Sequence, residues 1–454
     1  GGAVFTQGGG YLAMYRDHEA NRREFARHSP RDAENYDRYS RDVLRHCRFI
    51  RPLLLRTPPD PTSLRPRDLS ELAYIGKKLF AMPEKDIYAM IRFWTMSISD
   101  FLDEYFENPV IKAYLAVSSI IGTALGPMSP GSAYVLLHHY MGDVDGNIGA
   151  WGFARGGMGS ITQALMASFK EAGGEVRAGS GVEKILVRNG RTTGVVLANG
   201  DTFTASTVIS NMDVKRTFLK HVDEKELPPA FVSSVQRFKI RGSSGKVNIA
   251  LDALPRFPAL PEDSPCIRGD MHFTDSIERL ELAYDDWKAG RYSRDPFLDM
   301  MIPTTIDPTM TPPGKHFMSC FVQYAPPKIE GHEWTDADRD AFGQTVLNQI
   351  EEYSPGFKKL VLHAEVRTPR ELEAEVGLTE GNIFQGELTF DQLLFNRPVP
   401  GYAQYRSPVD GLWMCGSSTH PGGGVMGAPG RNAAAEILRS LKKPTVMGEA
   451  YAVL

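Results

Sequence analysis

A ligand-binding loop near the C-terminus is suggested by residue types and spacing in this 454-residue chain. Residues 412–415 form a short apolar run, the length of a buried strand. Seven glycines from Gly411 to Gly430 allow the backbone to turn tightly and to approach a ligand. A helical spacing of apolar residues begins at about Arg431. A strand, a glycine loop and a helix start present free amides and a partial positive charge, which suit a pyrophosphate or the electron-rich edge of a redox ring.

The glycines of this loop also match the dinucleotide fingerprint G-x-G-x-x-G at Gly422, Gly424 and Gly427. That motif requires a returning parallel strand and an acidic residue ~20 positions further on. No strand-like run follows the helix, so we reject an ordinary Rossmann motif. The alternative at this stage is a glycine-rich turn before a terminal helix.

A second glycine cluster, at residues 156–159, leads directly into a predicted helix over 161–172. Alternating strand patterns follow, at 175–177 and then from Val182. Asn-Gly turns at 189–190 and 199–200 separate the later strands. This order predicts a helix followed by a β-meander.

Residues 68–126 have a helical pattern, with predicted helices over 69–82, 83–106 and 109–125. The middle helix is unusually apolar and aromatic. One interpretation is a set of core helices in a domain that covers a substrate. The other is a hydrophobic lid or membrane-resting face through which a lipid-like substrate enters.

The segment 215–405 mixes both patterns and predicts an α+β domain. We expect strands over 246–252, 297–302 and 317–324, and helices over 342–353 and 370–376. Residues 334–339 read as a helix start, with Thr335 as its cap.

Two adjacent histidines, His138 and His139, precede the 151–159 segment. They cannot share one helix face and are therefore a poor metal pair. Each is expected to be a hydrogen-bonded structural residue, with the alternative that one of them faces a site.

Composition excludes several functions. A net charge of −4 without long basic blocks argues against nucleic-acid binding. The four cysteines are scattered singly, which excludes a C-x-x-C redox motif and a cysteine zinc site. No apolar run reaches the ~18–20 residues that span a bilayer. We predict no metal site.

A family resemblance adds to these patterns. The run Thr419-His420-Pro421-Gly422, with Gly424 and Gly427, resembles the C-terminal flavin-contacting signature of carotenoid-desaturase-like FAD proteins. The longer string through residue 435, with the runs 381–395 and 397–401, is similar to one branch of them. That branch is the pyridine nucleotide-disulfide oxidoreductase domain-containing protein 2 family, a relative of the phytoene desaturases.

The resemblance implies an α/β fold with an α+β insert, a Rossmann-like FAD/NAD(P)-binding flavoprotein fold of the glutathione-reductase or amine-oxidase type. It divides the chain into a largely helical substrate or cap region with a short hairpin (1–150), part of an FAD-binding domain (151–214), an α+β substrate domain (215–405) and the C-terminal part of the FAD-binding domain (406–454). Related proteins begin with a βαβ unit that holds the ADP half of FAD. We do not find that unit after Gly1 and interpret the chain as a fragment.

The implied function is an FAD-dependent oxidoreductase. It would act on carbon-carbon bonds of an apolar, polyene or lipid-like substrate by hydride transfer to or from flavin. The alternative is a non-catalytic binding or regulatory protein that retains the flavoprotein fold.

The resemblance assigns cofactor contacts to seven residues. They are Val182, Gly416, Ser417, Gly424, Val425, Met426 and Gly427. His420 is an acid/base candidate because it titrates near neutrality; the alternative is that it shapes the loop. Arg155 would lie over the cofactor or bind an acidic substrate group, or else be a solvated arginine.

The expected partner is an apolar small molecule and not a nucleic acid, and peripheral membrane contact and a homo-oligomer stay open. A cytoplasmic or mitochondrial-matrix location, with or without membrane association, is compatible with the resemblance.

Overall fold

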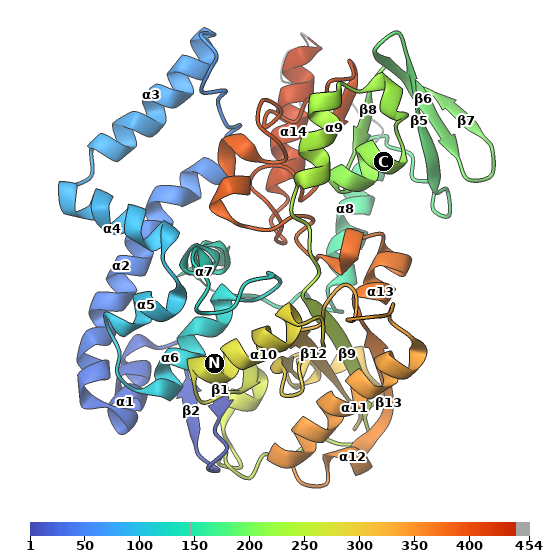
Figure 1. Ribbon diagram of the computed structural model, residues 1–454. Coiled ribbons are helices and arrows are strands. Elements are labelled where there is room, and N and C mark those ends of the chain that lie inside the picture. The colour runs from blue at the N-terminus through green and yellow to red at the C-terminus, as the bar shows by residue number, and fades with distance from the viewer. Residues whose placement is uncertain (145–146, 150, 442–454) are drawn as a thin grey trace.

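Figure 1 shows the computed structural model, which describes residues 1–144, 147–149 and 151–441. A helical region lies beside a seven-stranded sheet. A third region contains α14, α9 and the strands β5 to β8 and lies above the sheet in this view.

The large sheet combines the N-terminal hairpin with strands from much later in the chain. Its order is β13 (Val361–Arg367), β9 (Ser244–Leu251), β12 (His316–Gln323), β11 (Phe297–Met301), β10 (Asp270–Phe273), β1 (Gly2–Phe5) and β2 (Tyr11–Met14). Strand β1 runs parallel to β10, and the other neighbours are antiparallel. The expected hairpin and mixed sheet are therefore confirmed.

One face of this sheet packs on helix α11 (Asp336–Tyr353). Side chains alternate between the two faces of β9, so Val247, Ile249 and Leu251 point to the same face. There they pack in one hydrophobic core with Phe342 of α11. Thr335 caps α11 in a reciprocal capping box with Asp338, which confirms the predicted helix start. Smaller elements border this region: α10 (Ile277–Lys288), α12 (Phe357–Leu360) and α13 (Pro369–Glu371).

The helical region has its own large core, which also contains residues of the sheet. Its helices are α1 (His18–His28), α2 (Pro30–Leu54), α3 (Pro66–Phe80), α4 (Glu84–Thr95), α5 (Ile98–Asp103), α6 (Pro109–Ala116) and α7 (Ser132–Tyr140), followed by the short strands β3 (Asp143–Val144) and β4 (Asn147–Ile148).

Two of the predicted helices are shorter than expected. The helix over 83–106 is divided because Met96 is extended and Ser97 caps α5 through the amide of Asp100. The helix over 109–125 ends at Ala116, and a 3₁₀ turn follows it.

The third region contains helix α8 (Gly159–Glu171) and the predicted meander. The meander is β5 (Val182–Arg188), β6 (Arg191–Leu197) and β7 (Thr202–Thr204), and nearby lie β8 (Val208–Ser210), α9 (Pro229–Arg237), β14 (Leu412–Met414) and α14 (Ala428–Ser440). The predicted strand over 175–177 was wrong, because these residues join no sheet. Leu165 on the apolar side of α8 is 66% exposed.

The division of the chain at residues 150, 214 and 405 stays a prediction. Sheet pairing crosses all three boundaries, since β1 pairs with β10 and β14 pairs with β8. No helix among the described residues is long and apolar enough to cross a membrane.

Gln323, at the end of β12, connects the sheet to the helical region. Its buried amide accepts from Gly122 N (2.8 Å) and donates to Ile120 O (2.9 Å). These backbone groups lie in the turn between α6 and α7, where Gln323 is the partner of Gly122 N and one of the partners of Ile120 O.

Replacing Gln323 with Met removes these hydrogen bonds and leaves the buried N–H of Gly122 without its acceptor, while Ile120 O keeps its bond from Thr123 N. We expect the free energy of unfolding to fall by about 2–3 kcal/mol, measured by urea denaturation. The matched control is Gln344→Met, at an exposed position of α11, which should change it by about 0.5 kcal/mol or less. Equal stability of the two variants would contradict this role of Gln323.

Candidate functional site

The carboxyl ends of β8 and β14 lie side by side because the two strands are parallel neighbours. The loops that follow these strands approach so closely that a Cβ on Gly416 would lie 2.3 Å from Asn211 O. The carboxyl edge of parallel strands is where ligands bind in open α/β folds. The structure therefore places the glycine loop at such an edge.

Ser418 joins this loop to two other segments. Its Oγ accepts from Val214 N (3.0 Å) and donates to Gln385 O (2.6 Å). The Gln385 side-chain oxygen is buried, finds no hydrogen-bond partner among the described residues, and lies 3.1 Å from the Cβ that Gly416 lacks. Beside Gly416, the site thus has an acceptor suited to a hydroxyl or imide N–H of a ligand.

The far end of the loop is exposed. The side chains of Val425 and Met426 are 76% and 39% exposed. Helix α14 begins after Gly427, which adopts a positive φ of 65° and provides no side-chain cap. The first amides of α14 are therefore not capped by this residue and carry the positive end of the helix dipole.

His138, on α7, holds the middle of the loop. Its Nε2 donates to the carbonyl oxygen of Gly423, and a Cβ on Gly424 would lie 3.4 Å from the same nitrogen. Burial lowers the pKa of His138 to about 3, so the imidazole is neutral. One of the two adjacent histidines thus contacts the predicted site: the side chain of His138 binds the backbone of the glycine loop.

His420 is buried and bonded on both its side chain and its backbone. Its Nε2 donates to Leu53 O (3.0 Å) at the end of α2, and its own carbonyl oxygen accepts from the Tyr405 hydroxyl (2.8 Å). Burial lowers the pKa of His420 to about 4. These contacts favour loop shaping, and the catalytic role of His420 stays a prediction.

Arg397 anchors the loop from inside the protein. Its guanidinium donates to Ser417 O (2.7 and 3.1 Å) and to the carbonyl oxygens of Phe384, Gly386, Glu387 and Gln392. The loop and the segment 384–392 are therefore fixed to each other.

The two remaining predicted residues lie elsewhere. Val182 is half-buried against the core that contains β8 and β14. Arg155 is exposed, and its neighbour Gly156 donates its backbone N–H to Asp307 (2.7 Å). No contact among the described residues brings either of them to the loop, and their roles stay predictions.

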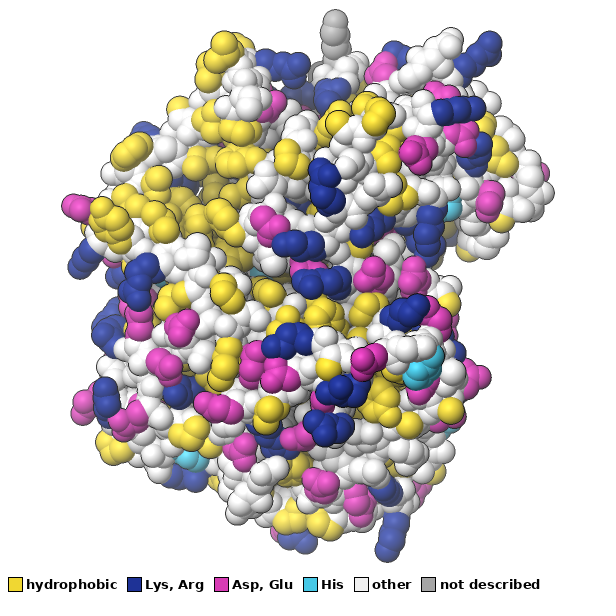
Figure 2. All heavy atoms as spheres, in the orientation of Figure 1, with side chains coloured by type: hydrophobic (Ala, Val, Ile, Leu, Met, Phe, Trp, Pro, Cys, Tyr) yellow, Lys and Arg dark blue, Asp and Glu magenta, His cyan; other side chains and the backbone are white. Residues whose placement is uncertain are grey.

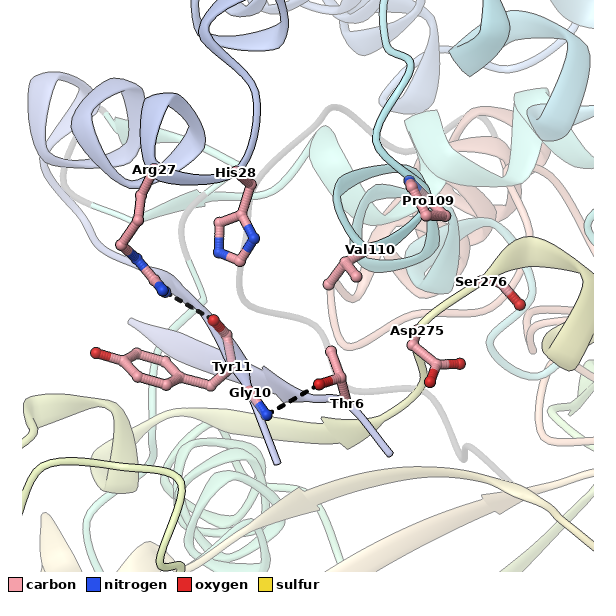
Figure 3. Close-up of a pocket in the computed structure, with 9 residues that line it drawn as sticks. All are labelled: Thr6, Gly10, Tyr11, Arg27, His28, Pro109, Val110, Asp275 and Ser276. Carbon is pink, nitrogen blue, oxygen red and sulfur yellow. Dashed lines mark hydrogen bonds between the residues drawn. The ribbon is translucent and has the colours of Figure 1, made fainter. Parts of the chain in front are cut away.

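A separate hollow of about 530 Å³ lies between the β1–β2 hairpin, α1 and α6 (Figure 3). Arg27 on its rim donates to Tyr11 O (2.7 Å), and the His28 ring points toward Val110. None of the predicted site residues lines this hollow.

Comparisons with known proteins agree with this geometry. Residues 21–438 match the protein family described as flavin-containing amine oxidoreductase. The chain belongs to this family.

Two relatives support the resemblance to desaturase-related proteins. The Mus musculus pyridine nucleotide-disulfide oxidoreductase domain-containing protein 2 is 38% identical over 451 residues, which cover 95% of this chain and 77% of the relative. A chloroplastic prolycopene isomerase of Daucus carota is 25% identical and covers 80% of this chain and 55% of that relative. The predicted family is therefore confirmed.

Among solved structures, a putrescine oxidase redesigned in its cofactor binding is similar in fold. Its TM-score is 0.54 at 11% identity, and the match covers 97% of this chain and 81% of that one. The flavoprotein fold class is confirmed. As a flavin oxidoreductase, the chain has a loop that fits the cofactor of its family, with exposed glycine amides, an uncapped helix start and an unpaired buried acceptor.

Sequence patterns alone did not identify the residues that hold this loop in place. Arg397 and Gln385 lie in runs that carry the family resemblance, and no local pattern marks Tyr405 as a site residue. Arg397 and Tyr405 donate to backbone carbonyls, and the Gln385 carbonyl accepts from the Ser418 hydroxyl, and no local spacing encodes these pairs.

The buried His420 makes stability depend on pH. Its folded-state pKa of about 4 lies below the ordinary 6.5, so the unfolded chain binds the proton more readily. This contribution to stability is present above pH 6.5 and is lost as the pH falls toward 4. The variant His420→Gln retains a donor for Leu53 O but has no imidazole to protonate. When the pH falls from about 7 to about 4.5, we expect its free energy of unfolding to decrease by about 2 kcal/mol less than that of the wild type.

The measurement is urea unfolding at the two pH values. Tyr405→Phe is the control, because it removes a hydrogen bond of His420 without removing the imidazole, and it should keep the wild-type pH dependence. A His420→Gln variant with the same dependence would rule out this contribution.

Proposed function

We propose that the protein is an FAD-dependent oxidoreductase that acts on carbon-carbon bonds of an apolar, polyene-like or lipid-like substrate. The observation that carries the proposal is the glycine loop at the carboxyl ends of β8 and β14, which leads into the start of α14 without a side-chain cap. The chain that contains this loop belongs to a flavin oxidoreductase family. Bound FAD would supply the hydride chemistry, and the protein would supply position and electrostatics.

Two parts of the loop have different roles in this proposal. Gly416 and Ser417, beside the unpaired Gln385 oxygen, would hold hydroxyl or imide groups of the cofactor. The amides from Gly424 to Gly427 would face its negatively charged parts, since they lie at the positive end of the α14 dipole. Val182, at the start of the meander, would contact the adenine through its backbone.

An apolar substrate is supported by relatives and by the surface. Besides the prolycopene isomerase, a phytoene desaturase of Pseudescherichia vulneris is 25% identical over 349 residues. Figure 2 shows hydrophobic side chains gathered around a hollowed area at the upper left, where Figure 1 places α3 and α4. The exposed apolar residues of this area are Leu64, Leu69, Phe80, Tyr88 and Ile91.

This α3–α4 surface would also let the protein rest on a membrane and take up a lipid-like substrate from it. Lys77 and Lys78 lie in the last turn of α3, beside Phe80, which is 83% exposed. An apolar side chain flanked by lysines is typical of segments that bind anionic lipid surfaces.

Flavin binding is tested by the absorption spectrum of the purified protein. We expect a near-visible flavin spectrum, either as isolated or after reconstitution with FAD. Gly424→Leu should abolish flavin retention, because Gly424 has a φ of 125°, a conformation that L side chains rarely adopt, and the loop must therefore change its shape.

The control is Gly314→Leu, which has a similar positive φ of 77° but open space around it and should retain flavin. Full occupancy in Gly424→Leu would refute the assigned loop. A colourless wild type that cannot be reconstituted would favour a non-catalytic binding protein.

Membrane contact is tested by flotation with anionic liposomes. We expect the wild type to float, and we expect Phe80→Glu combined with Ile91→Glu to reduce flotation at least about fivefold, because both changes place charges on the apolar surface. Leu362→Glu is the control, since Leu362 is an exposed apolar residue on β13. A wild type that stays at the bottom of the gradient would exclude the membrane interpretation.

A further inference from the structure

Arg397 is a buried cation without a carboxylate partner among the residues that the structure describes. Its side chain is 0% exposed. Glu387 gives its carbonyl oxygen to Arg397, but its carboxylate pairs with Arg241 through two bonds of 2.5 and 2.7 Å. The five carbonyl oxygens around Arg397 thus replace water, yet they carry no full negative charge to balance it.

The other groups that face this cation in the described part of the chain are also uncharged. The electrostatic neighbours of the guanidinium are Tyr134, His138 and His420, and it lies 5.8 Å from the centre of the Phe238 ring. Both histidines have pKa values well below neutrality. Burial lowers the pKa of Arg397 itself to about 9, so it stays protonated at neutral pH.

The cation lies directly behind the glycine loop. A Cβ on Gly422 would be 3.6 Å from Arg397 Nε, and Ser417 O accepts from both Nε and Nη2. The loop then continues to the exposed residues 424–427. The positive charge of Arg397 therefore lies on the buried side of the loop, and the end of the loop at residues 424–427 is exposed to solvent.

The hydrogen bonds to the loop carbonyls also orient its amides. In a trans peptide the C=O and the following N–H point in opposite directions. Binding of Ser417 O to Arg397 therefore turns the N–H of Ser418 away from the cation, and binding of Gly423 O to His138 turns the N–H of Gly424 away from α7.

We propose that Arg397 is a positioning residue of the cofactor site: it fixes the glycine loop, and its uncompensated charge behind the loop favours the reduced, more negatively charged flavin over the oxidised one. This inference rests on the proposed function. It assigns Arg397 no direct contact with the cofactor, because its donors are occupied by carbonyl oxygens.

Two substitutions separate charge from geometry. Arg397→Met removes the charge and the donors, whereas Arg397→Lys keeps the charge and loses the planar fork. Tyr405→Phe is the matched control, because it removes a hydrogen bond to the same loop, at His420 O, and changes no charge.

The first measurement is the flavin reduction potential of the full-length protein. We expect Arg397→Met to lose at least about tenfold in its preference for reduced flavin, a shift of about 30 mV to more negative potential for a two-electron couple. Arg397→Lys and Tyr405→Phe should stay near the wild-type potential. A wild-type potential in Arg397→Met, or an equal shift in Tyr405→Phe, would overturn the electrostatic role.

The second measurement is hydrogen exchange of residues 416–427 in protein stripped of flavin. We expect faster exchange in all three variants, most of all in Arg397→Met, and unchanged exchange in that variant would overturn the positioning role. If Arg397→Met does not fold, Arg397→Lys decides. Faster exchange together with a wild-type reduction potential supports the proposal. A reduction potential shifted by about 30 mV or more, which is a tenfold change in the preference for reduced flavin, contradicts it. A wild type that binds no flavin would instead refute the proposed function, while the exchange experiment still tests the positioning role.

Discussion

The buried Arg397 guanidinium is the interaction on which the geometry of the site depends. A cation cannot stay inside a protein unless polar groups replace its water, and here five backbone carbonyls do so. Those carbonyls belong to two segments of irregular backbone, 384–392 and the glycine loop. Their oxygens would themselves be unpaired without the arginine. The requirement is mutual, and it holds a loop rich in glycine in one conformation.

The need of buried polar groups for hydrogen-bond partners also joins this loop to the helical region. His420 contacts the end of α2 at Leu53, and His138 reaches the loop from α7. Helix α14 is fastened in the same way: its buried Glu436 accepts from Thr57 (2.6 Å) and from Arg67 on α3 (2.6 Å). The position of the glycine loop and that of the apolar α3–α4 surface are thus properties of one connected structure.

Much of the fold follows from local patterns in the sequence. The Asn-Gly turns specified the β-meander, and the Thr335 cap with Asp338 specified the start of α11. The errors have local causes as well: Ser97 competes for the backbone and divides an apolar helix, and the alternation at 175–177 finds no partner strand. For the site, the pattern of strand, glycines and helix located the loop, and the family resemblance supplied its cofactor.

The sequence by itself determined the family, the secondary structure of the long periodic segments and the place of the glycine loop, because periodicity, turn residues and glycine spacing are properties of neighbouring residues. Only the tertiary structure decided that the N-terminal hairpin completes a sheet with β10 and that His420 is bonded to Leu53. It also decided that Arg397 lies behind Gly422 with no counter-charge among the described residues. These features depend on burial and on partners up to several hundred residues away. Burial determines which groups lose water and which partners must replace it, and no local pattern in the chain records that.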